Sequence, residues 1–176
     1  MRDVAALRPA PPPRRPAEVR QAVVPSPEFS RFLYTAVGGD WYWIDRLPWT
    51  YVEWRRWVGR PELSTWVAAQ EGSPAGYAEL EVQARAGSEP GVDVEISAFG
   101  LLPQFRGAGV GGWFLTEVLR RAWATNPRRV WVHTCSLDGP AALSNYQARG
   151  LSVYDQRTEE MSLPEGPPGP WPGARN

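Results

Sequence analysis

Lysine is absent from this chain of 176 residues, so all nineteen of its basic residues are arginines. Cysteine and histidine occur once each, as Cys135 and His133, which excludes an internal disulfide framework and the common zinc clusters. We therefore expect no bound metal. Nineteen acidic residues balance the arginines, and the formal net charge is zero. A nucleic-acid partner is not expected, because no basic field would recruit it.

Long apolar runs are also lacking. No stretch approaches the roughly 20 apolar residues that cross a bilayer, and the N-terminus has no hydrophobic signal core. These absences predict a cytoplasmic protein with no membrane partner. The two ends are rich in proline, which predicts disordered tails at residues 1–17 and 164–176. The remaining residues 18–163 have the length of one domain with its own core.

Glycine alternates through residues 104–112, at the junction of a strand pattern and a helix pattern. Residues 92–99 alternate apolar and polar side chains, and residues 113–124 carry apolar side chains at helical spacing. The first N–H groups of a helix lack intrahelical partners, and the helix dipole places partial positive charge there. Glycine lets a ligand come close to the backbone. The segment therefore predicts a phosphate-binding loop.

Two common glycine loops do not fit this segment. A Walker loop has a lysine followed by Ser or Thr after its last glycine, whereas Gly112 precedes Trp113. A nucleoside triphosphatase is thus not expected. A dinucleotide fold has a Gly-x-Gly-x-x-Gly fingerprint and an acidic residue about 20 residues later. Here the glycines are Gly107, Gly109 and Gly111, and no acidic strand end follows.

The spacing that fits is Gln/Arg-x-x-Gly-x-Gly/Ala, met by Gln104, Gly107 and Gly109 with Arg106 and Gly111 beside them. This loop resembles that of the GNAT superfamily of acyl-CoA-dependent N-acyltransferases. Residues 141–151 are similar to the family's helix ending in Tyr-x-x-x-Gly-Phe, with Leu in place of Phe. The resemblance covers roughly residues 65–160.

The resemblance implies acetyl-CoA as co-substrate. In the family the loop and helix N-terminus hold the pyrophosphate of coenzyme A, while the end of the preceding strand hydrogen-bonds the pantetheine arm. The cofactor-binding residues implied in this way are Phe99, Gly100, Leu101, Gln104, Arg106, Gly107, Ala108, Gly109, Val110, Gly111 and Gly112. Many members also carry an Asn seven residues before the helix Tyr, where its side chain meets the pantetheine. This chain has Gly139 there, and the substitutes are the adjacent Asp138, a backbone group or water.

The pattern of elements predicts an α+β or mixed α/β fold. Its order is β-α-α-β-β-β-α-β-α-β, which agrees with the GNAT fold, a mixed central sheet flanked by helices. The expected strands are residues 19–24, 63–70, 76–83, 92–99, 129–135 and 151–161. The expected helices are residues 26–37, 50–58, 113–124 and 141–148.

Three residues are candidates for donating or accepting the protons that move during acyl transfer. By the resemblance, Tyr146 protonates the sulfur of coenzyme A, and a carboxylate at Glu95 accepts the amine proton. His133 is the alternative base, since an unperturbed histidine titrates near neutral pH. Glu79 and Glu81 are weaker substitutes for Glu95. Cys135 is a further alternative as an acyl-accepting nucleophile, but no partner to activate it is evident; we expect direct transfer in a ternary complex.

Aromatic residues crowd the segment that covers the acceptor site in the family. Of these we expect Trp41 and Trp43 to face the substrate, because aromatic rings can stack on a planar or cationic group. The predicted acceptor is a small, partly apolar or aromatic molecule with a primary amine. The alternatives are a protein or peptide acceptor, another acyl donor, and a noncatalytic module that binds coenzyme A or a partner. A homodimer, formed through the last strand or the aromatic segment, is a further expectation.

Overall fold

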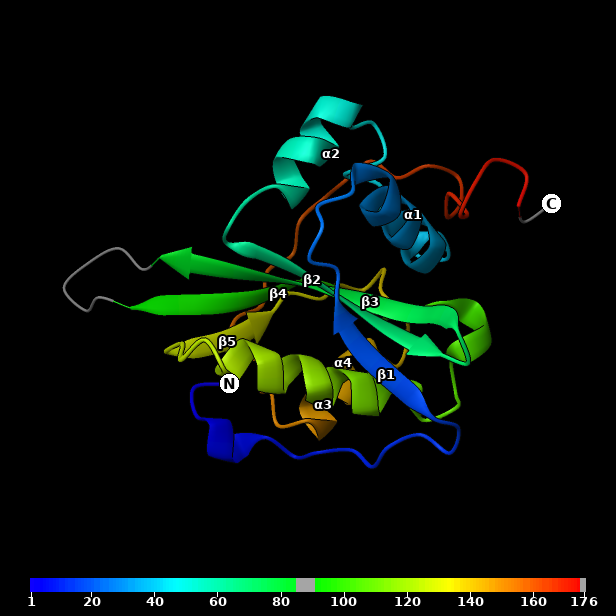
Figure 1. The fold of residues 1–176 in the computed structure, drawn as a ribbon. Coiled ribbons are helices and arrows are strands. Elements are labelled where there is room, and N and C mark those ends of the chain that lie inside the picture. Colours follow the sequence, from blue (N-terminus) through cyan, green and yellow to red (C-terminus); the bar gives the residue numbers. More distant parts are fainter. Residues whose placement is uncertain (85–90, 175–176) are drawn as a thin grey trace.

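The computed structural model describes residues 1–84 and 91–174, which form a mixed sheet with helices on both faces (Figure 1). The strands are β1 (Ala17–Gln21), β2 (Leu63–Gln70), β3 (Ser73–Ala84), β4 (Val92–Leu101) and β5 (Arg129–Val132). The helices are α1 (Pro27–Gly38), α2 (Tyr51–Val58), α3 (Val110–Trp123) and α4 (Ala142–Ala148). Short 3-10 turns occur at Val4–Ala6 and Pro103–Phe105.

The strands lie in the order β1-β2-β3-β4-β5. The first four are antiparallel to their neighbours, and β5 is parallel to β4. A parallel pair needs a crossover connection, and α3 provides it. Between β3 and β4 the register shifts, because Leu80 faces Ile96 while Glu79 faces Ala98. Ser97 is therefore the extra residue of a β-bulge, which bends the strand that carries it.

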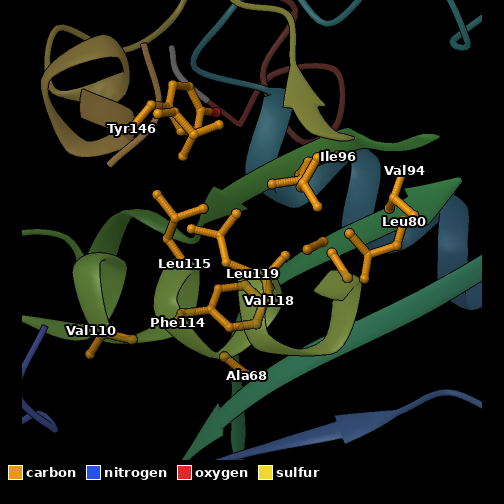
Figure 2. Close-up of a cluster of buried hydrophobic side chains, with 14 of the residues drawn as sticks. Ala68, Leu80, Val94, Ile96, Val110, Phe114, Leu115, Val118, Leu119 and Tyr146 are labelled. Carbon is orange, nitrogen blue, oxygen red and sulfur yellow. The ribbon is translucent and has the colours of Figure 1, made fainter. Parts of the chain in front are cut away.

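The helices form two layers (Figure 1), with α1 and α2 on one face of the sheet and α3 and α4 on the other. The larger core lies on the α3 side, where Phe114, Leu115 and Leu119 are fully buried. Figure 2 shows these side chains pointing toward Leu80 and Ile96 of the strands. A second core under α1 and α2 is built on aromatic rings, among which Trp54 is almost fully buried.

Local sequence signals explain where the first two helices begin. The Ser26 hydroxyl accepts a hydrogen bond from the N–H of Phe29, and Pro27 occupies the first helical position of α1. At α2, Thr50 and Glu53 form a reciprocal capping box. The predicted helices and the predicted mixed sheet flanked by helices are therefore confirmed.

Two strand predictions were wrong near the C-terminus. Strand β5 ends at Val132, not at Cys135, and residues 151–161 form no strand. At its outer edge β5 is already paired, since Val130 and Met1 exchange backbone hydrogen bonds of 2.8 and 3.0 Å. The chain after α4 contacts β5 through a side chain, since the ring of Tyr154 lies 5.1 Å from the Arg129 guanidinium carbon.

The two proline-rich ends lie against the domain in the described residues. Near the N-terminus, the Arg8 N–H donates to the carbonyl of Arg149, and the Gly169 N–H near the C-terminus donates to Gly39. The division into a domain at 18–163 and two disordered tails stays a prediction. Among the described residues, no helix has both the length and the apolar content needed to cross a membrane.

Candidate active site

The predicted glycine loop connects β4 to α3 in the structure. Gly107 and Gly109 have backbone φ angles of 77° and 79°, in the left-handed region that favours glycine. A Cβ atom at either position would meet nothing within 4 Å, so the loop is open to an incoming group. Gly109 caps α3 without a side-chain hydrogen bond, and the first turn contains no acidic residue. The free N–H groups of this turn are thus left to an external anion.

Strands β4 and β5 are paired over only part of the length of β4, and we call the unpaired region beyond the last pair the opening between the two strands. The two strands pair only from Asp93 to Ile96 on β4 and from Arg129 to Val132 on β5. Beyond the bulge, β4 continues to Leu101 while β5 has ended. In the described part of the chain, the backbone of residues 98–101 therefore has no strand partner on its β5 side. An extended ligand could form hydrogen bonds with this edge as an added strand would.

Tyr146 lies on the α3 and α4 side of this opening. Its ring packs edge-on against Phe99 with 6.1 Å between the centroids, and Figure 2 shows it reaching inward from α4. Burial raises the pKa of the Tyr146 hydroxyl well above its usual value, and the nearby Asp138 carboxylate adds to the rise. Among the described residues the hydroxyl has no hydrogen-bond partner. It therefore keeps its proton at neutral pH and is free to donate it.

Glu95 and His133 come together across the end of β5. The Glu95 carboxylate accepts a hydrogen bond of 2.7 Å from the Gln83 amide, and its other oxygen lies 2.8 Å from His133 Nδ1. Glu95 is 8% exposed, whereas the His133 ring is largely open to solvent. The bond to Glu95 raises the pKa of His133, against a smaller opposing effect of burial. With Nδ1 bound to Glu95, Nε2 is the ring nitrogen left to accept a proton.

The other carboxylates of this face are engaged elsewhere. Glu79 has no exposed surface, and it accepts hydrogen bonds from Arg46 at 2.6 Å and from Trp57 at 3.1 Å. Glu81 pairs with Arg60 at 2.7 Å. Glu79 is thus a structural group, and Glu81 is held by its own cation. Of the three glutamates weighed as bases, only Glu95 contacts the histidine.

The two candidate acceptor tryptophans have different surroundings. Trp43 packs against Tyr34 and Tyr77, with ring centroids 5.4 and 6.2 Å apart, and belongs to the second core. Trp41 lies at the opening itself, because a Cβ on Gly139 would be 2.9 Å from its ring. The Arg106 guanidinium of the glycine loop lies 5.1 Å from the same ring. Trp41 therefore spans the glycine loop and the loop after β5.

Cys135 is exposed, and its backbone N–H donates to the Asp138 carboxylate. Gln83 was missed as a site residue, and Asp138 was considered only as a substitute for the Asn absent at Gly139. Gln83 shares a strand face with Glu79 and Glu81 by period-two alternation, which is the signal that could have found it. Asp138 lies in a loop, where no periodic signal exists.

Comparisons with known proteins agree with this geometry. A family model described as Acetyltransferase (GNAT) family matches residues 29–151. No curated protein matches the sequence significantly. Several solved structures share the fold. One is an aminoglycoside acetyltransferase from an uncultured soil metagenomic sample in complex with trehalose, with 13% identity, a TM-score of 0.67 and coverage of 85% of this chain and 97% of that one.

Two further solved structures show how varied the similar proteins are. AAC(6')-Iy in complex with a bisubstrate analogue, CoA-S-monomethyl-acetylneamine, has 18% identity and a TM-score of 0.63, covering 84% of this chain and 98% of its own. A transcriptional regulator from Bacillus halodurans has 15% identity and a TM-score of 0.66, covering 84% and 100%. At such low identity these structures show the fold alone. The family model spans well over half of the sequence, and the chain belongs to the Acetyltransferase (GNAT) family of acyl-CoA-dependent N-acyltransferases.

Proposed function

We propose that this protein transfers the acetyl group of acetyl-CoA to a primary amine of a small molecule, directly and in a ternary complex. One observation supports the proposal: Glu95, paired with His133, and Tyr146 lie about the opening between β4 and β5, where a base and an acid would be needed. The open glycine loop lies at the far end of that opening. Acyl transfer to an amine needs all three parts.

The residues fit the co-substrate in two places. The loop from Gln104 to Gly112 would hold its diphosphate through backbone N–H groups, and the edge from Phe99 to Leu101 would hold its pantetheine arm. Acetyl-CoA supplies the thioester that carries the acetyl group. His133 takes the proton of the acceptor ammonium at Nε2, while Glu95 holds Nδ1 and stabilises the charged ring. The Tyr146 hydroxyl holds a proton for the sulfur that departs.

The acceptor class rests on the aromatic segment and on the similar structures. Trp41 lies at the opening, where its ring can contact a planar or cationic group. Two of the similar structures are aminoglycoside acetyltransferases, whose acceptors are small amines. A small-molecule amine is therefore the acceptor that we propose, with Trp41 as the ring that contacts it; Trp43 packs in the second core. The proposed function is tested against three alternatives: a peptide acceptor, a longer acyl donor and a noncatalytic binding role.

The acid is tested by Tyr146→Phe, which keeps the ring that packs on Phe99. We expect kcat to fall about tenfold. This is less than general acid catalysis often contributes, because a thiol of pKa near 8.5 can depart as the thiolate without first being protonated. Thiol release should be followed over a panel of amines with acetyl-CoA. Tyr154→Phe, at an exposed tyrosine, is the matched control. Full activity of Tyr146→Phe would remove this residue from the mechanism, and no turnover of any amine by the natural protein would favour a binding module.

The phosphate loop is tested by Gly109→Glu. A carboxylate there would lie next to the diphosphate, and repulsion between like charges should weaken binding of coenzyme A at least about tenfold relative to Gly109→Ala. The alanine variant is the matched control, because both side chains bear the same strain at a φ of 79°. Calorimetric titration measures both constants. Equal affinities in the two variants would contradict the assignment of the loop.

A further inference from the structure

The side chain of Arg149 lies on the first turn of α3. Arg149 caps the C-terminus of α4, and its guanidinium turns toward Gly112, the third residue of α3. A Cβ atom on Gly112 would lie only 2.5 Å from Nη1 of Arg149. The guanidinium therefore fills the space that a side chain at position 112 would take, within one helical turn of the open Gly109.

This position is unfavourable for a cation without a partner. The N-terminus of α3 carries partial positive charge, and its first turn contains no acidic side chain. Within residues 1–84 and 91–174, Arg149 forms no salt bridge, and its Nε is buried without a hydrogen-bond partner. A buried N–H group of a charged side chain costs free energy until an acceptor reaches it. One anion placed beside Gly109 and Gly112 would offset the positive charge at the helix N-terminus and could also accept a hydrogen bond from the guanidinium.

The backbone of Arg149 is fixed in this place by the N-terminal segment. The Arg8 N–H donates to the Arg149 carbonyl at 3.2 Å, and the Ala10 N–H donates to the Thr116 hydroxyl of α3 at 3.0 Å. Residues 8–10 thus bridge the end of α4 and the second turn of α3. These contacts hold the backbone of Arg149 at the end of α4 that faces the loop.

We propose that Arg149 is a ligand of a phosphate group of bound coenzyme A, beside the backbone N–H groups of the glycine loop. The inference rests on the acetyl-CoA binding proposed above and adds a specificity-determining side chain to it. A guanidinium offers parallel N–H donors that match two phosphate oxygens, which backbone groups alone do not neutralise. The phosphate belongs either to the diphosphate or to the 3'-phosphate of the ribose.

The test is a set of calorimetric titrations at fixed salt. The ligands are coenzyme A, 3'-dephospho-coenzyme A and 4'-phosphopantetheine, and the proteins are the natural sequence and Arg149→Met, which keeps the aliphatic stem. We expect Arg149→Met to bind coenzyme A about 10- to 100-fold more weakly, as for the loss of a charge-assisted hydrogen bond. If this loss persists with the dephospho ligand, Arg149 binds the diphosphate. If the loss disappears, it binds the 3'-phosphate.

Controls separate this inference from stability and from the proposed function. Arg120→Met removes an arginine of α3 that is paired with Glu117, and it should leave the affinity unchanged. Arg149→Gln serves if Arg149→Met does not fold, as judged by a thermal melt. Equal affinity of Arg149→Met and the natural protein for coenzyme A would overturn the role of Arg149 alone. No binding by the natural protein would overturn acetyl-CoA binding and the inference with it.

Discussion

Replacing His133 by alanine is expected to lower kcat/KM about 100-fold at neutral pH, because a positioned general base contributes about 10²- to 10⁴-fold. The ring is exposed at Nε2 and held at Nδ1 by Glu95, so its removal takes away the proton acceptor while the opening between β4 and β5 stays intact. Initial rates with saturating acetyl-CoA measure the effect. A variant with unchanged kcat/KM would show that the acceptor loses its proton without this residue.

The Glu95–His133 pair also predicts a pH dependence. The hydrogen bond to Glu95 raises the pKa of His133 above its usual value of about 6.5, so the neutral ring that accepts a proton forms only at higher pH. Activity should therefore rise with pH through this raised pKa. In Glu95→Gln the carboxylate is gone, the pKa of His133 falls, and the rise should begin at lower pH. The plateau should fall as well, because the charged ring loses its stabilising partner.

Two controls test whether the pH dependence of activity comes from the Glu95–His133 pair. Glu81→Gln removes the carboxylate opposite Glu95 on β3, which pairs with Arg60 instead, and should leave the pH of the rise unchanged. The acceptor amine also titrates, so the profile should be measured with two acceptors of different amine pKa. A rise that follows the acceptor, or that Glu95→Gln does not move, would count against His133 as the base.

Replacing Arg46 by methionine is expected to lower the free energy of unfolding by about 3–5 kcal/mol, the usual cost of removing one partner of a buried ion pair. Glu79 has no exposed surface and loses its 2.6 Å partner. The same guanidinium lies 4.0 Å from the centre of the Trp57 ring, and this contact is lost too. Urea unfolding at pH 7 measures the difference.

Second variants identify the cause of that loss. Adding Glu79→Gln to Arg46→Met removes the unpaired charge and should restore part of the stability. Arg20→Met breaks an exposed pair with Glu18 and should cost no more than about 1 kcal/mol. A loss of less than 1 kcal/mol in Arg46→Met would mean that water reaches Glu79 or that the segment before α2 rearranges around it.

Local sequence patterns were sufficient to predict the strand, the glycine loop and the helix that we propose bind the acyl donor. The alternation of β4, the glycines at 107 and 109 and the apolar spacing of α3 are all short-range signals, and the structure has strand, open loop and helix where they predict them. The helix caps at Ser26 and Thr50 are likewise local. Such features can be read from sequence because backbone geometry decides them within a few residues.

The base could not be assigned in this way. Glu95 and His133 stood as alternatives in the sequence, yet the structure pairs them, because β5 is parallel to β4 and ends one residue before the histidine. Register between parallel strands depends on a crossover and on packing, which no local pattern encodes. For the same reason, the edge contact of Met1 with Val130 and the missing strand after α4 were not foreseen.

The single extra residue at Ser97 has a further consequence for β4. Side chains alternate along a strand, so Glu95 and Phe99 would share a face if the alternation were unbroken. The bulge reverses the parity between them: Glu95 lies opposite Glu81 on the α1 side, while Phe99 packs with Phe114 on the α3 side. A strand without Ser97 would direct Phe99 away from Tyr146. In the proposed mechanism, this one inserted residue places the base, Glu95 with His133, on one face of the strand and the contact with the acid, Tyr146, on the other.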